Sequence, residues 1–265
     1  MARDDRAAAP AGRRKGASPV LAVLALLLIV LFAGLGTWQV YRLQWKLDLI
    51  ARVEARVHAA PAPLPPRERW AGITPDSDEY RRVRLRGTYL YDLTTPVQAL
   101  TEQGSGYWLL TPLCTDQGIV LVNRGFIPAE LGARTRYAPQ RAAGDPCAGA
   151  RGNAVDITGL LRTSEHDGAF TRTNDPAANR WYTRDVAAIA AARGIQAAPF
   201  FVDAAARQNP PDSPDQPVGG LTVVKFPNSH LVYAFTWYAL SLMVAGAWWW
   251  VARRGDEPSH DERHD

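Results

Sequence analysis

Few side chains in this sequence have the chemistry of a catalyst or a metal ligand, and His230 stands out among them. It lies in the stretch GLTVVKFPNSHLVYAFTWYAL (residues 220–240), immediately before a long apolar run. A neutral imidazole is a common ligand of haem iron and of other metals. A histidine at a membrane surface can equally be a polar anchor or a helix cap, and the residue type alone leaves these roles open.

Other reactive chemistries have little support in the sequence. No G-x-S-x-G nucleophile elbow occurs, and a triad of Ser229, His230 and Asp203 would rest only on two of them being neighbours in the chain. Glycine-rich phosphate loops are also missing from the sequence. The residues available to a soft metal site are few: His58, His166, His230, Met1 and Met243. We therefore expect a binding or interaction protein and not an enzyme.

The chain has two cysteines, Cys114 and Cys147. They are 33 positions apart, so they do not form a C-x-x-C redox or zinc motif. In an oxidising compartment they would be able to form one disulfide. The alternative is two unpaired thiols, and the sequence does not decide between these states.

Two uncharged apolar runs near the ends of the chain are long enough to cross a membrane. Val20–Trp38 has nineteen residues and Leu231–Ala252 has twenty-two. At about 1.5 Å per helical residue each reaches about 28 Å or more, against a hydrocarbon core of about 30 Å. A cleaved signal peptide is the alternative for the first run. The basic residues 13–15 and 253–254 flank the runs and predict that both termini are cytoplasmic.

The segment between the apolar runs is predicted to be exported, into the periplasm of a Gram-negative host. From Gln39 to His230 it carries 22 basic and 19 acidic residues, a balance that argues against a nucleic-acid surface. The expected protein is a multi-pass protein of the bacterial inner membrane. Its predicted parts are a cytoplasmic tail (1–19), a transmembrane helix (20–38), a periplasmic domain (39–230), a second transmembrane helix (231–252) and a cytoplasmic tail (253–265).

Residue periodicity predicts that the exported domain is β-rich. Apolar residues keep a helical rhythm through 39–59, until the proline-rich segment 60–66 stops it. A short helix is predicted at 185–194, with Gly194 as its cap. The fold class is therefore a membrane protein with two transmembrane helices flanking an exported β-rich α+β domain. The predicted strands are 81–91, 106–114, 118–128, 154–162, 198–204 and 220–226, with a hairpin turn at 115–117.

Four stretches of this chain carry a family resemblance. They are LGTWQVYRLQWKLDLI, GIVLVNRGFIP, LLRTSEHDGAFTRTNDPAANRWYTRDVAAIAAARG and FPNSHLVYAFTWYAL, in that order. With the two flanking helices, they resemble the Surfeit locus protein 1 family of cytochrome c oxidase assembly factors. The resemblance runs from Gly34 to Leu240 but leaves out the proline-rich loop RQNPPDSPDQPVGG and both tails.

This resemblance implies a protein that helps to build haem-copper oxidase and binds haem a. The haem-linked histidine of the family lies in an N-x-H motif, which here is Asn228, Ser229 and His230. His230 would then be an axial ligand of the iron. The implied partners are the catalytic subunit of cytochrome c oxidase and the enzymes of haem a synthesis, besides membrane lipid. The alternative is a scaffold without haem that holds an oxidase assembly intermediate through its periplasmic domain.

Helical spacing suggests which residues would surround the haem. We expect Trp237 and Trp38 to pack against its two faces and Arg42 to pair with a propionate. The alternatives are an aromatic belt for the tryptophans, headgroup contact for Arg42 and close helix packing at the small residues. The two stripes expected to face each other are His230, Ala234, Trp237 and Ser241 on the second helix and Gly34, Trp38, Arg42 and Trp45 on the first.

Arg124 and Gly125, in the stretch VNRGF, are candidates for a surface that docks the oxidase. Arg124 is alternatively an ion-pair partner inside the domain. Gly125 alternatively serves a turn or a close backbone approach.

Overall fold

The computed structural model describes residues 18–129, 137–138, 140–150, 152–165, 172–222 and 228–254. Residues 13–15, His166 and part of the strand expected at 220–226 lie outside this range. The chain forms two compact units, one from residues up to Ile50 together with those from Phe226 onward, the other from Ala51–Lys225.

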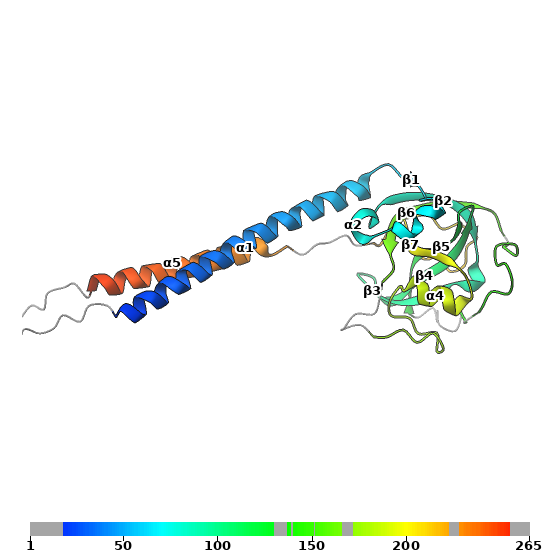
Figure 1. Cartoon of the computed structure of the whole chain (residues 1–265). Coiled ribbons are helices and arrows are strands. Elements are labelled where there is room, and N and C mark those ends of the chain that lie inside the picture. Colours follow the sequence, from blue (N-terminus) through cyan, green and yellow to red (C-terminus); the bar gives the residue numbers. More distant parts are fainter. Residues whose placement is uncertain are drawn as a thin grey trace, which may run out of the picture. The chain divides into compact units, whose positions relative to one another are not determined.

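The helices and strands follow one another along the chain as labelled in Figure 1. They are α1 (Pro19–His58), β1 (Ala62–Pro63), η1 (Arg67–Gly72), α2 (Pro75–Asp78), β2 (Arg82–Tyr89), η2 (Tyr91–Leu93), β3 (Thr95–Thr101), β4 (Gly104–Thr115), β5 (Gly118–Pro128), β6 (Val155–Thr163), α4 (Val186–Arg193), β7 (Ala197–Ala204) and α5 (His230–Arg254).

The first unit is an antiparallel pair of helices, α1 and α5, which lie side by side (Figure 1). α1 is 40 residues long and runs to His58 without a break, as the apolar rhythm predicted. Both helices are long and apolar enough to cross a membrane. Their large apolar side chains are mostly exposed, among them Leu27 on α1 and Leu242 on α5. An exposed apolar surface of this kind suits a lipid environment.

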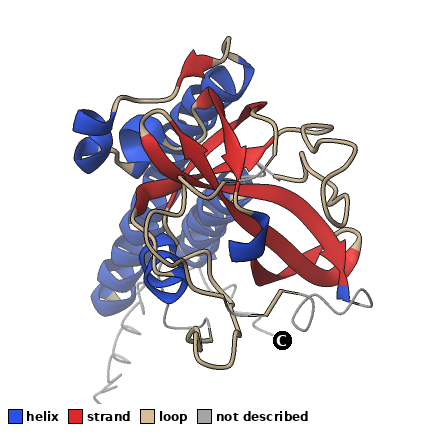
Figure 2. Cartoon of the chain, turned by 90° about the vertical axis from the view of Figure 1, so that its right-hand side faces the viewer, coloured by secondary structure: helices blue, strands red, loops and turns tan. Residues whose placement is uncertain are grey.

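Strands of the second unit close into a ring (Figure 2). β2 pairs with β6, β6 with β7, β7 with β5 and β5 with β4, and β4 returns to β2 through Thr88–Cys114 and Tyr89–Leu113. The β5–β7 pair is parallel and the other pairs of the ring are antiparallel. β1 and β3 lie outside the ring, on β2 and β4. Closure into a barrel leaves the ring strands without a free edge.

The hairpin between β4 and β5 forms as predicted. Thr115 pairs with Gly118, and the Thr115 hydroxyl donates to the Gly118 carbonyl at 2.7 Å. Gly118 has a φ of 128°, which a glycine adopts without strain. β3 was not predicted, because Pro96 interrupts its pattern. The structure tolerates this proline because β3 ends the sheet order.

β5 contributes to two hydrophobic cores. Val120 and Val122 pack in the core of the ring, while Ile119 and Leu121 pack with α4 on the other side. This explains why β5 reads as a continuous apolar run and not as an alternating one. α4 begins with the Asp185 side chain accepting from a backbone N–H, and Gly194 caps its end with a φ of 67°, as predicted.

Candidate functional site

His230 is the first residue of α5, and its ring contacts α1. Its Nδ1 lies 2.8 Å from the side-chain oxygen of Gln39, which is itself buried. An amide oxygen only accepts hydrogen bonds, so Nδ1 carries the proton and Nε2 keeps its lone pair. Within the described part of the chain, Nε2 has no hydrogen-bond partner. The imidazole therefore presents a free donor atom to a metal.

The other residues of the His230 stripe also face α1. Ala234 is buried, and the Trp237 ring stacks on Phe32 with centroids 5.7 Å apart. The Ser241 hydroxyl donates to the Ile29 carbonyl at 3.1 Å. The space expected beside these small residues for a haem ring is filled by α1. Here the expectation was wrong, because small residues let two helices pack closely.

The facing residues of α1 differ from the predicted stripe. Gly36 packs so closely that an added Cβ would lie 2.9 Å from the Tyr238 ring, whereas Gly34 has no neighbour within 4 Å of such an atom. Trp38 is 54% exposed. The guanidinium of Arg42 lies 4.4 Å from the Trp45 ring centroid, on the same exposed stripe.

Gln39 thus takes the place beside His230 that was predicted for Trp38. One residue along a helix turns the side chain by about 100°, so a rotation error of a single position exchanges the two. Gln39 directly follows the uncharged run Val20–Trp38. A buried amide in such a helix needs a hydrogen-bond partner, and this was the available signal.

A network of buried ion pairs lies in the second unit. Asp203 on β7 is 3% exposed and accepts from the Nη1 atoms of Arg162 and Arg184 at 2.8 and 3.1 Å. Arg162 also donates to Glu79 at 2.7 Å, and Arg184 is paired with Glu165. Sequence reasoning missed this network, because its members come from segments far apart in the chain.

The network forms the floor of a cavity of about 660 Å³. Trp108 and Leu221 contribute apolar walls, and the turn at Thr101–Gln103 closes one side. Each arginine is already matched by carboxylates, so the floor is a rigid polar surface and not a vacant anion site. Across the described residues, no three histidine, cysteine or acidic side chains gather in a way that would hold a metal ion.

The comparison with known proteins decides the family. Residues 26–242 match the model of the SURF1 family. The chain belongs to the SURF1 family. It is 38% identical to Surfeit locus protein 1 of Homo sapiens, with 88% of this chain and 77% of the relative covered. Surfeit locus protein 1 of Mus musculus is 38% identical (81% and 70% covered), and the SURF1-like protein of Monosiga brevicollis is 35% identical (85% and 85%). This is the family that the four sequence stretches resembled.

Arg124 of this SURF1-family protein does not form a docking surface. It is 0% exposed, and its Nε donates to the Thr111 hydroxyl at 3.0 Å. Its guanidinium also lies 4.8 Å from the Tyr91 ring centroid and donates to the Pro214 carbonyl. The docking prediction is therefore wrong, because β5 is buried on both faces. The continuous apolar run around Arg124 was the sequence signal for that burial.

Gly125 serves the close backbone approach that was the alternative for it. It has a φ of 135°, and an added Cβ would lie 2.4 Å from the carbonyl of Val218. The neighbouring Phe126 exchanges two backbone hydrogen bonds with Val218, both at 2.9 Å. A side chain at position 125 would break this contact, so Gly125 is structural and not a docking residue.

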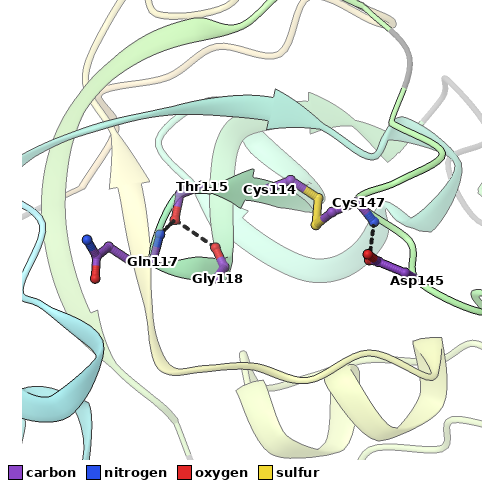
Figure 3. The surroundings of a disulfide bond; sticks show 6 residues. All are labelled: Cys114, Thr115, Gln117, Gly118, Asp145 and Cys147. Atoms are coloured by element: carbon purple, nitrogen blue, oxygen red, sulfur yellow. Dashed lines mark hydrogen bonds between the residues drawn. A yellow bond between two sulfur atoms is a disulfide. The ribbon is translucent and has the colours of Figure 1, made fainter.

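Cys114 and Cys147 are joined in a disulfide (Figure 3). The Cys147 N–H donates to the Asp145 carboxylate at 2.9 Å in the same loop. Of the two states left open by the sequence, the structure has the bridge. A disulfide agrees with an oxidising compartment for this SURF1 domain.

We expect the stability of this protein to fall in acid partly through Glu165. Burial raises the pKa of its carboxyl, but the hydrogen bonds and charge of Arg184 outweigh burial and hold the pKa below the ordinary value of 4.5. The unfolded chain therefore binds the proton first, and the stabilisation is lost as the pH falls from about 4.5 through the folded pKa. Denaturant unfolding measured against pH checks this.

Glu165→Gln removes the titrating group, so its stability is expected to decline less steeply over that acid range than that of the wild type. Glu68→Gln, at an exposed glutamate, is the control and keeps the wild-type slope. Parallel declines for Glu165→Gln and wild type would contradict the assignment.

Proposed function

We propose that this SURF1-family protein is an assembly factor for haem-copper cytochrome c oxidase. It binds haem a and assists its delivery to, or its retention in, the catalytic subunit, and it receives haem a from the enzymes of haem a synthesis. It acts in the bacterial inner membrane, with both termini cytoplasmic and its main domain in the periplasm. Membership of the family and two helices long enough to cross a membrane support this proposal.

The observation that carries the haem proposal is the contact of His230 with Gln39. An axial histidine must be neutral and must offer a ring nitrogen with a free lone pair, and its other N–H is usually held by an acceptor. With Nδ1 held by Gln39 at 2.8 Å, Nε2 of His230 meets both requirements. When bound there, haem a would supply the iron centre that the oxidase needs.

The other candidate haem contacts are of unequal value. Trp38 and Arg42 lie on the exposed stripe of α1, so a ring face and guanidinium donors remain available for the macrocycle and a propionate. Trp237 already stacks on Phe32, so it supports the helix pair rather than a haem face. We therefore keep Trp38 and Arg42 as proposed contacts and assign Trp237 to packing.

The test is the visible spectrum of the detergent-purified protein, co-expressed with the enzymes of haem a synthesis. We expect a haem a band in the wild type that is lost or shifted in His230→Ala at equal protein recovery, because the iron loses its ligand. His58→Ala is the matched control, since His58 is exposed and its Nδ1 bonds a backbone carbonyl in its own helix. Its spectrum should equal that of the wild type.

Equal bands in wild type and His230→Ala would remove His230 as a necessary ligand. Colourless protein in both would favour the second candidate function, a scaffold that holds an oxidase intermediate without haem. The cavity of about 660 Å³ beside the 84%-exposed Leu100 is the observation that favours a scaffold. For a scaffold, His230→Ala would leave oxidase assembly in membranes intact.

A further inference from the structure

We propose that Gln39 is a positioning residue for the iron ligand. It fixes the tautomer of His230 and the orientation of its ring, so that Nε2 is held as the free donor before any haem arrives. This inference rests on the proposed function. It extends that function from one residue to a pair contributed by the two helices.

The hydrogen bond itself sets the tautomer. Nδ1 of His230 and Oε1 of Gln39 are 2.8 Å apart, and only the nitrogen can donate. Without this partner, either ring nitrogen is free to carry the proton and the ring can turn about its broad χ2 minimum. A ligand with an undefined tautomer is ready for the metal only part of the time, which lowers its apparent affinity.

The surroundings hold Gln39 opposite His230. A second polar contact joins the same helices, between the hydroxyls of Thr37 and Tyr238 at 3.0 Å. The close approach of Gly36 to the Tyr238 ring fixes the separation of the helices at this level. A buried amide in an apolar helix pair is costly unless it is hydrogen bonded, so the pairing with His230 also stabilises the position of Gln39.

The choice of an amide has a chemical consequence. A neutral acceptor orients the imidazole without drawing strongly on its proton. A carboxylate in the same place would make the ligand more basic, which stabilises ferric iron and lowers its reduction potential. Gln39→Glu should therefore still bind haem a, at a more negative midpoint potential than the wild type. Gln39→Leu keeps the bulk of the side chain and loses the acceptor.

The first readout needs no haem. Histidine ring nitrogens are labelled with ¹⁵N and observed by NMR in detergent, at a pH well above the ordinary histidine pKa of about 6.5. The His230 signals are assigned by their loss in His230→Ala. We expect an Nδ1-protonated ring in the wild type, in Gln39→Glu and in Gln44→Leu, and a mixture or the other tautomer in Gln39→Leu. Gln44 is an exposed glutamine on the same helix and serves as the matched control.

The second readout is titration of ferric haem a into the same proteins. Loss of a residue that orients a metal ligand typically weakens binding 10- to 100-fold, and we expect that range for Gln39→Leu against Gln44→Leu. Equal affinities of these two variants, or the same His230 tautomer in both, would overturn the role of Gln39 while haem binding by the wild type stands. Wild-type protein that binds no haem a would overturn the proposed function and this inference together.

Discussion

Asp203→Ala is expected to lower the free energy of unfolding by about 3–5 kcal/mol, the range for removing one partner of a buried ion pair. The carboxylate of Asp203 accepts from Arg162, Arg184, Asn123 and the hydroxyl of Thr222, at 2.8 to 3.1 Å for the closest contact of each. Without it the two guanidinium groups would face each other in a dry site, each held by only one remaining carboxylate. Unpaired buried charge is the main cost, and the lost hydrogen bonds add to it.

The measurement is denaturant unfolding of the full chain in detergent, followed by tryptophan fluorescence. Asp203→Asn retains the shape and one acceptor oxygen but loses the charge, so its stability should fall between those of wild type and Asp203→Ala. Asp156→Ala, at an exposed position on β6, controls for the loss of an aspartate from the barrel. If Asp203→Ala were no less stable than Asp156→Ala, the network would not stabilise the fold.

Removal of the disulfide, as Cys114→Ser with Cys147→Ser, is expected to cost about 2–4 kcal/mol of stability. The bridge closes a loop across 33 positions, and opening it restores the conformational entropy of the unfolded chain. It also ties the loop at Cys147 to the end of β4 (Figure 3). Denaturant unfolding of wild type and double variant, each with and without reductant, measures the difference.

Reductant should bring the wild type to the stability of the double variant and leave the variant unchanged. A thiol assay on unfolded wild-type protein provides the independent check. Two free thiols in protein purified without reductant would show that the bridge does not form in the cell, and the disulfide would then give no support to an oxidising compartment.

Local patterns in the sequence were enough for several elements. The two apolar runs predicted α1 and α5, and alternation around the turn at 115–117 predicted the hairpin of β4 and β5. Gly194 marked the end of α4. These features depend on residues close together in the chain, where propensity and periodicity act directly. The family could also be identified from the sequence, because four short stretches keep their order.

Contacts between distant segments could not be predicted in this way. Closure of the ring needs β4 to meet β2 and β5 to pair in parallel with β7, and neither pairing has a local signature. The same closure buries Arg124 and brings Arg162, Arg184 and Asp203 together. In the sequence these are ordinary charged residues of strands and loops. Their burial follows from which strands become neighbours.

The site shows the same division. The sequence by itself determined that His230 stands at the start of an apolar helix, because composition alone marks that boundary. It did not determine what His230 faces. A helix that is apolar all round carries no amphipathic signal for its rotation, so Trp38 and Gln39 were equally available as neighbours. Only the packing of α1 against α5, through Gly36 and Tyr238, decided that the amide and not the indole meets the imidazole.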